Sequence, residues 1–580
     1  AFPLFGYQTH RGARQEAWMH GSRWQNLVWL LVCGVLSSAW CLTAGRQIGA
    51  TFDEPVYIAR GLDGWRTGSH HGLLRLGTMP LPADVQTFPL YLAERVRGIP
   101  WDLDADFPTL LAAARATNLV FWWLLLVYGW RTGRSLAGEW GGRLAVAAIA
   151  CEPNLLAHAA LATTDVAVTA CLLMFAYHYR AGTGAGVVRR VVIPGLSFGV
   201  ALMAKASALV FAPLVMLACF TAGERRSAGR TWADGRAFAV DGLKIGLIGL
   251  FVMTVMCGCD WQPLPSFIAW ARQLPDGGMK TTMAWLADHL CIFSNGPEAI
   301  VRQIKHNASG HGTFLLGEAK MGAFWYYFPV VATIKLTLPL LIAPLVLAAI
   351  RPSSLRNWAC AVAIVLFAFS LTYRVQIGIR LLLPCVAFAV VGVSAAAVRA
   401  SVEASARRGF IVRAATVGGI VWATAACVSV WPHGLCYVNE LWGGRRDGYR
   451  LVGDSNYDWG QGLPELARWT ARHELAGMDV WYFGTDPRVR HAPLREMPFH
   501  IQPVQTPEQI RERLEGRYLA VGTSILYGHG LTEAHRQAAR YLRSLTPVGR
   551  TTTFLIFHFA HESAPTMQTR RVPPTSREGS

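Results

Sequence analysis

Charged residues are scarce in this sequence. Asp, Glu, Lys and Arg make up 16% of its 580 residues, whereas hydrophobic residues make up 52%. A soluble globular domain carries about 25% charged residues, so this composition excludes an ordinary soluble protein and indicates a membrane protein.

Lysine is rarer still, and its scarcity bears on the meaning of the net charge of +18. Only six of the 54 basic residues are lysines, and the arginines stand in short clusters between hydrophobic runs. A nucleic-acid-binding protein would gather its basic residues on one soluble face. Clusters between hydrophobic runs are instead typical of loops that set membrane topology, so no nucleic-acid partner is expected.

The cysteines follow no metal-binding pattern. No CxxC pair and no zinc-ligand spacing occurs among the twelve cysteines, most of which lie inside hydrophobic runs. Cys259 and Cys291 share one predicted loop, and a disulfide between them stays an alternative. The first hydrophobic run, 26–45, has the length of a retained span and not of a cleavable signal peptide.

Hydrophobic runs long enough to cross a bilayer occupy much of the chain. They predict a mainly α-helical polytopic membrane protein with about eleven transmembrane helices, at 26–45, 108–130, 143–158, 162–180, 191–204, 206–221, 238–258, 324–350, 357–374, 377–398 and 411–431. Short arginine-rich segments alternate with two long loops, 46–107 and 259–323. The positive-inside rule places the arginine-rich segments in the cytoplasm, and the long loops and the C-terminal part outside.

One boundary decides the orientation of every later span. The stretch 191–221 is either one long helix or two short spans broken near Lys205. Only the second reading keeps all the basic clusters on one side of the membrane. We therefore predict a break at Lys205, which places this lysine at the outer membrane face.

The domain organisation follows from these spans. Residues 1–25 are predicted to be a cytoplasmic N-terminal segment, and 26–431 a transmembrane domain that includes the two long loops. Helix-like and strand-like patterns alternate after Pro432, which predicts an extracytoplasmic α/β domain over 432–561. The polar residues 562–580 are predicted to be disordered.

Three carboxylates are candidates for chemistry at the outer membrane face. Asp53 and Glu54 follow the first span directly, where a carboxylate is costly to hold near apolar surface. Asp53 is a candidate general base, and Glu54 is a candidate to orient it or to bind a cation. Asp165 begins the fourth span from the same side. The alternatives are a solvated loop for the pair and a helix cap for Asp165.

Four cations on different predicted helices lie near the same face: Arg115, Lys205, Lys335 and Arg380. Any one of them can extend to the lipid headgroups. Together, and beside the carboxylates, they indicate a cavity that holds a phosphate or a pyrophosphate.

Seven blocks between about residues 26 and 485 occur in a recognisable order: TFDEPVYIARG, an Arg early in the second span, EPNLLAHAALATTD, MAKASALVFAP, FWYYFPVVATIKLTLPL, IGIRLLLP and SNYDWGQGLPELARW. Together they resemble the bacterial polyprenyl-phosphate-dependent glycosyltransferases of the GT-C class. Protein O-mannosyltransferases and lipid A aminoarabinose transferases are relatives of that group.

The resemblance implies a sugar donor linked to polyprenyl phosphate and bound from the membrane. It also implies that Asp53 is the base, that Asp165 is the acidic residue of the TTD block, and that the cations of the second, eighth and tenth spans hold the donor phosphate. Two family histidines are missing, because TMPL at 78–81 replaces a His-Pro-Pro-Leu stretch and Leu381 follows Arg380. Their loss weakens the case for a bound divalent metal, so neither a metal site nor another cofactor is assigned.

The sequence therefore predicts a multi-pass glycosyltransferase of the cytoplasmic membrane. It would transfer a hexose or pentose, with inversion, to an acceptor on the outer side of the membrane. The sequence leaves open whether that acceptor is a protein, a lipid or a glycan. The alternative is a transporter or flippase of lipid-linked sugars, or a non-catalytic scaffold in envelope assembly. A transporter is expected to show repeated halves, and the sequence shows no such duplication.

Overall fold

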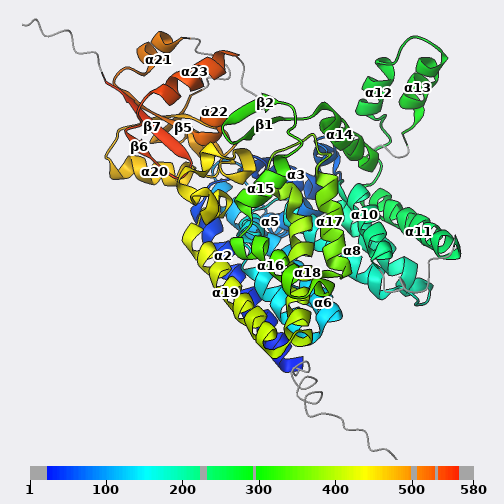
Figure 1. Cartoon of the computed structure of the whole chain (residues 1–580). Helices are drawn as coiled ribbons and strands as arrows, with labels where there is room; N and C mark the ends of the chain where they lie inside the picture. The colour runs from blue at the N-terminus through cyan, green and yellow to red at the C-terminus, as the bar shows by residue number, and fades with distance from the viewer. Residues whose placement is uncertain (1–22, 223–231, 292–294, 498–505, 529–532, 561–580) are drawn as a thin grey trace, which may run out of the picture.

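The computed structural model describes residues 23–222, 232–291, 295–497, 506–528 and 533–560. Its long helices form a bundle, and a small α/β unit and two groups of short helices lie at one end of that bundle (Figure 1). The mainly α-helical fold class is confirmed. Most of the predicted N-terminal segment, and the predicted disordered tail 562–580, lie outside the described residues.

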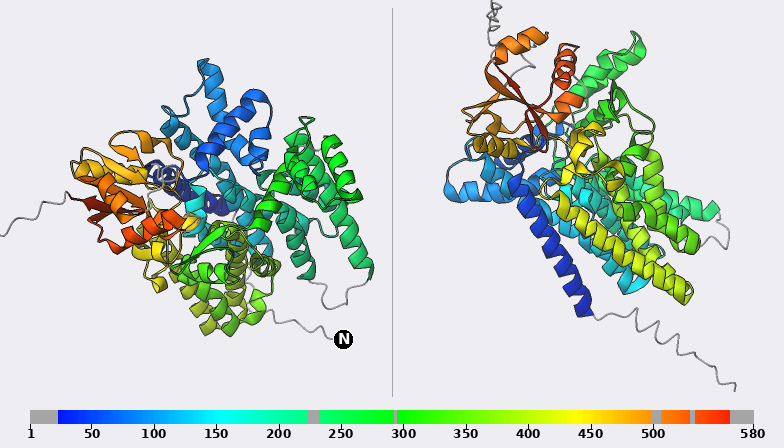
Figure 2. Two further views of the ribbon diagram at one scale, coloured as in Figure 1. Left: turned by 90° about the horizontal axis from the view of Figure 1, so that it is seen from above. Right: turned by 60° about the vertical axis from the view of Figure 1, so that its left-hand side comes forward.

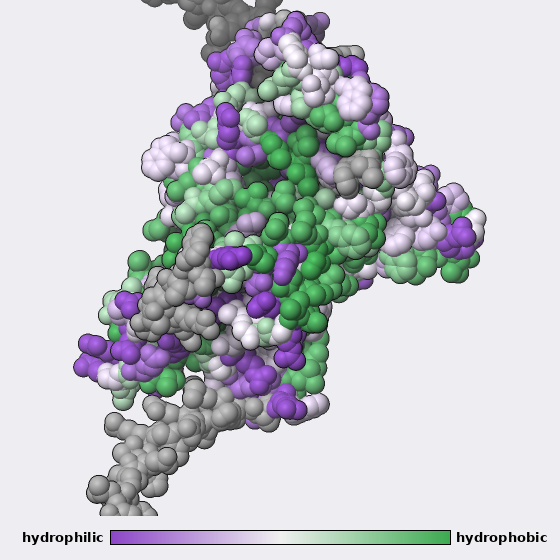
Figure 3. Space-filling view, turned by 90° about the vertical axis from the view of Figure 1, so that its right-hand side faces the viewer, coloured by the Kyte–Doolittle hydropathy of each residue, from purple (hydrophilic) through white to green (hydrophobic). Residues whose placement is uncertain are grey.

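Five described helices are long and apolar enough to cross a bilayer. They are α2 (Arg23–Gln47), α6 (Phe107–Ala150), α11 (Trp232–Cys257), α18 (Leu383–Glu403) with the 3-10 turn η4 (Ile379–Leu382) before it, and α19 (Ala406–Val430). A sixth candidate is the pair α15 (Tyr327–Lys335) and α16 (Leu338–Ile350), which is bent by 104°. Hydrophobic side chains cover much of the face shown in Figure 3. The count of eleven spans stays a prediction.

A tight turn divides α6 into two arms. Ala137 and Gly138 leave the helical conformation, and Gly138 has a φ of +69°, which favours glycine. A Cβ added to Gly133 would lie 2.4 Å from the carbonyl oxygen of Gly141, so glycine is what lets the two arms approach. The turn falls in the basic loop predicted between the second and third spans. Two further helices, α7 (Pro153–Ala159) and α8 (Asp165–Ala181), follow.

The predicted break at Lys205 is present. Helix α9 (Ile193–Ala204) ends directly before Lys205, whose backbone is extended, and α10 (Ala208–Thr221) begins shortly after it. Helix α10 packs against α8 and against the short apolar helix α17 (Trp358–Ser370).

The orientation predicted from this break can be tested by thiol labelling. In a background without Cys259 and Cys291, a cysteine at Asp63 or Gly310 should react with a membrane-impermeant maleimide in intact cells. A cysteine at Gly184 or Ser227 should react only after the cells are permeabilised. Labelling of Ser227 in intact cells, with Gly310 protected, would show that α9 and α10 do not return the chain to the side from which it entered.

The two long loops form short helices above the bundle. The first contains α3 (Glu54–Thr67), α4 (His71–Leu74) and α5 (Leu81–Arg97). The second contains α12 (Pro265–Arg272), α13 (Gly278–His289), α14 (Asn295–Ser309), and the hairpin of β1 (Gly312–Leu315) and β2 (Glu318–Met321). Helices α12 and α13 project on the side opposite the α/β unit (Figures 1 and 2). The sulfur of Cys259 lies 3.0 Å from the carbonyl oxygen of Cys291, and no disulfide joins these two residues.

The α/β unit has the alternating elements that the sequence predicts. These are α20 (Leu463–Arg472), β3 (Met478–Trp481), β4 (Leu494–Glu496), α21 (Pro507–Leu514), β5 (Arg517–Gly522), α22 (Thr523–Tyr527), α23 (Glu533–Ser544), β6 (Gly549–Arg550) and β7 (Phe554–Phe559). The sheet order is β4-β3-β5-β7-β6, with β3 parallel to both of its neighbours. Ala520 packs with α20, while its neighbours Leu519 and Val521 join the cluster that includes α21 and α23, as alternation along a strand requires.

Candidate active site

A cavity of about 1070 Å³ lies where the short helices of the two long loops meet the bundle. Its lining comes from the residues before and within α3, from the turn after α4, from the start of α8, and from α10, α12, α14, η4 and the end of α17. One part of the lining is apolar and comes from α10 and from α17 with the turn after it: Leu209, Val210, Phe211, Phe369 and Tyr373. The remainder is rich in charged groups.

The charges that line the cavity are mostly positive. Among the described residues of its lining, one side chain is a carboxylate, Asp53, and five are cations: Arg75, Lys205, Arg302, Lys305 and Arg380. Burial lowers the pKa of His306, which also lines the cavity, so this histidine is neutral at pH 7. A cavity with this excess of arginine and lysine suits an anionic ligand.

Four of the predicted site residues form one polar cluster beside this cavity. Arg380 Nη1 donates to Asp53 Oδ2 at 3.0 Å and lies 3.9 Å from Asp165 Oδ2. Lys205 Nζ donates to Asp165 Oδ1 at 2.6 Å. These residues come from four separate parts of the chain, and tertiary packing brings them together.

The cluster leaves hydrogen-bonding capacity unused. Arg380 Nε is buried and has no acceptor among the described residues. Asp53 Oδ1 likewise makes no hydrogen bond within the described part of the chain, and the Asp53 side chain keeps 24% of its exposure. Asp165 is 1% exposed, and its carboxylate contacts the two cations instead of capping α8. The Asp53–Arg380 pair therefore keeps one unused acceptor, on the partly exposed Asp53 carboxylate, and one unused donor, the buried Arg380 Nε.

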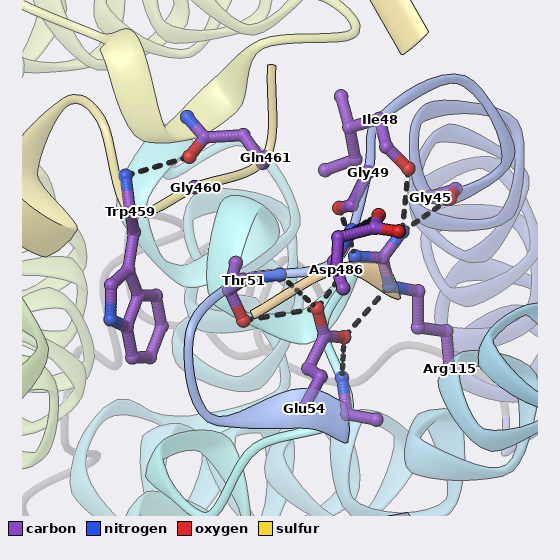
Figure 4. Close-up of polar contacts among 12 residues, drawn as sticks. Gly45, Ile48, Gly49, Thr51, Glu54, Arg115, Trp459, Gly460, Gln461 and Asp486 are labelled. Atoms are coloured by element: carbon purple, nitrogen blue, oxygen red, sulfur yellow. Dashed lines mark hydrogen bonds and ion pairs between the residues drawn. The ribbon is translucent and has the colours of Figure 1, made fainter. Parts of the chain in front are cut away.

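The position of Asp53 depends on its neighbour Glu54, which is fully buried. Arg115 Nε and Nη2 donate to the two oxygens of Glu54 at 2.7 and 2.6 Å, and the other Arg115 donors reach the carbonyl oxygens of Gly45, Ile48 and Gly49 (Figure 4). Glu54 also accepts from the backbone N–H groups of Thr51 and Ala162. This network fixes the end of α2 and the start of α3, and so it fixes the residue between them that carries the candidate base.

The structure does not place the other two predicted cations at the cavity. Arg115 is 3% exposed and belongs to the Glu54 network. Lys335 is 1% exposed, and its ammonium donates to the carbonyl oxygens of Leu435, Tyr437 and Asn456 at 2.6 to 2.8 Å. Lys335 thereby fastens the chain that follows α19 to the break between α15 and α16.

The sequence analysis assigns no role to one residue at the site, Trp459. The indole of Trp459 lies under the Arg380 guanidinium, with Arg380 Cζ 4.2 Å from the ring centroid. Trp459 is 2% exposed, and its carbonyl oxygen accepts from the N–H of Phe52, next to Asp53. The DWGQG stretch was a usable signal, because a tryptophan that follows an aspartate and precedes two glycines in a polar segment is unusual for an ordinary loop.

The comparisons with known proteins agree with the resemblance seen in the sequence. Residues 108–240 match the family model described as dolichyl-phosphate-mannose-protein mannosyltransferase. The matched segment contains Arg115, Asp165 and Lys205, whereas Asp53 and Arg380 lie outside it. The predicted relation to this group of glycosyltransferases is thus confirmed over that segment. No curated protein matches the chain at the level of sequence.

Solved structures with a similar overall course of the chain include ArnT from Cupriavidus metallidurans in complex with undecaprenyl phosphate. It is 13% identical, with a TM-score of 0.42, over 91% of this chain and 97% of that one. The oligosaccharyltransferase of Archaeoglobus fulgidus in its apo form is 9% identical, with a TM-score of 0.48, over 89% of this chain and 72% of that one.

Proposed function

We propose that this protein transfers a sugar from a polyprenyl-phosphate donor to an acceptor on the outer side of the cytoplasmic membrane, with inversion at the sugar carbon. The observation that carries the proposal is the Asp53–Arg380 pair. The Asp53 carboxylate is partly exposed, the Arg380 guanidinium has an unused donor, and both residues line the same cavity. One group can accept a proton and the other can bind a phosphate. The family match over residues 108–240 supports the same chemistry.

The cavity has a suitable place for each part of such a donor. The phosphate would lie against Arg380 and Lys205, since a guanidinium and an ammonium both bind phosphate oxygens. The polyprenyl chain would follow the apolar lining of α10 and α17, where Val210 is 43% exposed and so is open to lipid. The sugar would then occupy the space beside Asp53.

The reaction follows from this placement. Asp53 takes the proton of the acceptor hydroxyl or amine as the acceptor oxygen or nitrogen bonds to the anomeric carbon. The bond between that carbon and the phosphate oxygen breaks, and its electron pair leaves on polyprenyl phosphate. Arg380 and Lys205 stabilise the charge that develops on the leaving oxygen, which is usually the larger contribution in reactions of this kind. Attack from the face opposite the phosphate inverts the anomeric centre.

The direct test uses purified full-length protein in nanodiscs. Native mass spectrometry should detect bound undecaprenyl phosphate, and membranes that supply undecaprenyl-phosphate-linked sugars should show their conversion to free undecaprenyl phosphate. Mass spectrometry of envelope glycans and glycoproteins from a deletion strain should then reveal the acceptor as a species that loses one sugar. Binding without turnover, and with no missing glycan, would favour the flippase or scaffold interpretation instead.

A further inference from the structure

The segment 454–461, between the bundle and the α/β unit, contacts Arg380 and the backbone that leads to each member of the Asp53–Arg380 pair. It belongs to the C-terminal part of the chain, about 400 residues from Asp53. Its partners are the backbone before Asp53 on one side and the backbone before Arg380 on the other. The α/β unit therefore adjoins the site by way of this segment.

The first set of contacts holds the chain that leads to Asp53. The N–H groups of Gly49 and Phe52 donate to the carbonyl oxygens of Gln461 and Trp459, at 2.7 and 2.9 Å. Between them, the N–H of Ala50 donates to Asp486 Oδ2 at 2.9 Å. Figure 4 shows Gly49 and Thr51 beside Glu54 and Arg115, together with Trp459, Gly460 and Gln461 of the 454–461 segment.

The second set holds the chain that leads to Arg380. The N–H of Ile379 donates to Asn456 Oδ1 at 2.8 Å, and Ser455 Oγ donates to the carbonyl oxygen of Ile377. Asn456 is itself fully buried, and its amide nitrogen donates to the hydroxyl of Tyr327 at 3.0 Å.

The turn that carries Trp459 is itself rigidly held. Gln461 accepts from the Trp459 N–H at 2.7 Å and donates to the carbonyl oxygen of Tyr457 at 2.8 Å. Gly460 has a φ of +95°, and a Cβ there would lie 2.7 Å from the carbonyl oxygen of Phe483, so only glycine fits. Asp458 accepts from the N–H of Gly460, and burial raises the pKa of this carboxyl to about 6.

From these contacts we infer that Trp459 is a positioning residue of the transferase site, which holds the Arg380 guanidinium in the plane where it meets both Asp53 and the donor phosphate. Its ring supplies the face on which the guanidinium rests, and its carbonyl oxygen holds the backbone next to Asp53. The inference rests on the proposed function. It makes the C-terminal part of the chain a component of the donor site, in addition to any contact that it makes with the acceptor.

The stacking contact explains why an aromatic side chain is needed at this position. A guanidinium over an indole is attracted by the negative ring face, most strongly where water is excluded. Trp459 is 2% exposed and Arg380 is 11% exposed, so the contact is largely dry. Leucine can fill much of the same space but presents no such face, whereas phenylalanine keeps a smaller one.

The test is a double-mutant cycle on the binding of undecaprenyl phosphate, the carrier part of the donor, to purified protein in nanodiscs. Trp459→Leu should raise the dissociation constant by about 5- to 30-fold, and Trp459→Phe should recover most of that loss. In an Arg380→Met background, Trp459→Leu should have little further effect, because the contact that it removes is already gone. In turnover assays, the loss from Trp459→Leu should appear mainly in KM for the donor.

Trp122 provides the matched control, because it is also a fully buried tryptophan, but its indole N–H donates to Ser37 Oγ within the helix bundle instead of lying beside Arg380. Trp122→Leu should lower thermal stability while leaving the donor dissociation constant of folded protein unchanged. The inference is overturned if Trp459→Leu binds donor as the wild type does, or if its loss adds in full to that of Arg380→Met. If the wild type itself binds no undecaprenyl phosphate, the proposed function fails and the inference fails with it.

Discussion

Asp53→Asn is expected to lower the rate of sugar transfer by ~100-fold or more, with normal protein abundance and nearly normal donor binding. Asparagine keeps the size of aspartate and can still accept a hydrogen bond from Arg380, but it cannot take a proton from the acceptor. The measurement is the initial rate of undecaprenyl phosphate release in nanodiscs, at saturating donor. Donor binding is measured separately by native mass spectrometry.

Asp63 offers a control for this substitution on the neighbouring helix. Its side chain is 45% exposed and pairs at the surface with Arg60. Asp63→Asn should therefore leave transfer unchanged, since an exposed ion pair contributes little. Transfer at the wild-type rate by Asp53→Asn would remove the base from the proposed mechanism and would favour the transporter or scaffold interpretation.

Arg380→Met is expected to weaken donor binding by about 10- to 150-fold, because each charge-assisted hydrogen bond lost from a desolvated phosphate is worth roughly 1.5–3 kcal/mol. The measurement is a titration of nanodisc-embedded protein with undecaprenyl phosphate. Arg380→Lys should fall between the wild type and Arg380→Met, because lysine keeps the charge but not the planar fork that can contact Asp53 and a phosphate together.

Arg115→Met tests, in the same assay, whether Arg115 acts in folding and not in donor binding. Arg115 lies in the Glu54 network and not in the cavity lining, so its loss leaves a buried carboxylate without a cation to pair with. We expect a loss of stability of roughly 3–5 kcal/mol, seen as low yield and a lower melting temperature, while the protein that does fold binds donor normally. Weakened donor binding by stable Arg115→Met, with normal binding by Arg380→Met, would reverse the two roles.

Several features of the fold could be predicted from local sequence. In a bilayer, each backbone N–H and C=O must be satisfied within its own helix, so long hydrophobic runs such as those of α2 and α19 specify helices without reference to partners. Hydrophobic periodicity predicted the helix–strand alternation of the C-terminal unit, and the positive-inside rule, applied to all the basic clusters, predicted the break at Lys205. The predicted site grouped four cations with Asp53 and Asp165 as a phosphate-binding cavity, and the structure brings Lys205 and Arg380 of these cations together with the two carboxylates.

The partners of individual charges could not be predicted in this way. Arg115 and Lys335 have the same sequence character as Lys205 and Arg380, since each is a lone cation near the end of a hydrophobic helix. Only the fold reveals that Arg115 meets Glu54 and that Lys335 meets three carbonyl oxygens, while the other two cations line a cavity.

Trp459 is a second case in which the sequence does not reveal the partner of a charged residue. Nothing local marks a tryptophan as the partner of an arginine that lies 79 positions earlier in the chain. Its role depends on the path of the 454–461 segment over the end of the bundle, which is set by long-range contacts with Gly49, Phe52 and Ile379. The sequence alone determined the long hydrophobic helices, the C-terminal α/β elements and the chemical types of the candidate site residues, because these depend on hydrophobicity and on backbone hydrogen bonds between near neighbours. The tertiary structure decided which charges are buried in pairs and which face the cavity, because that choice depends on distances between residues that only packing brings together.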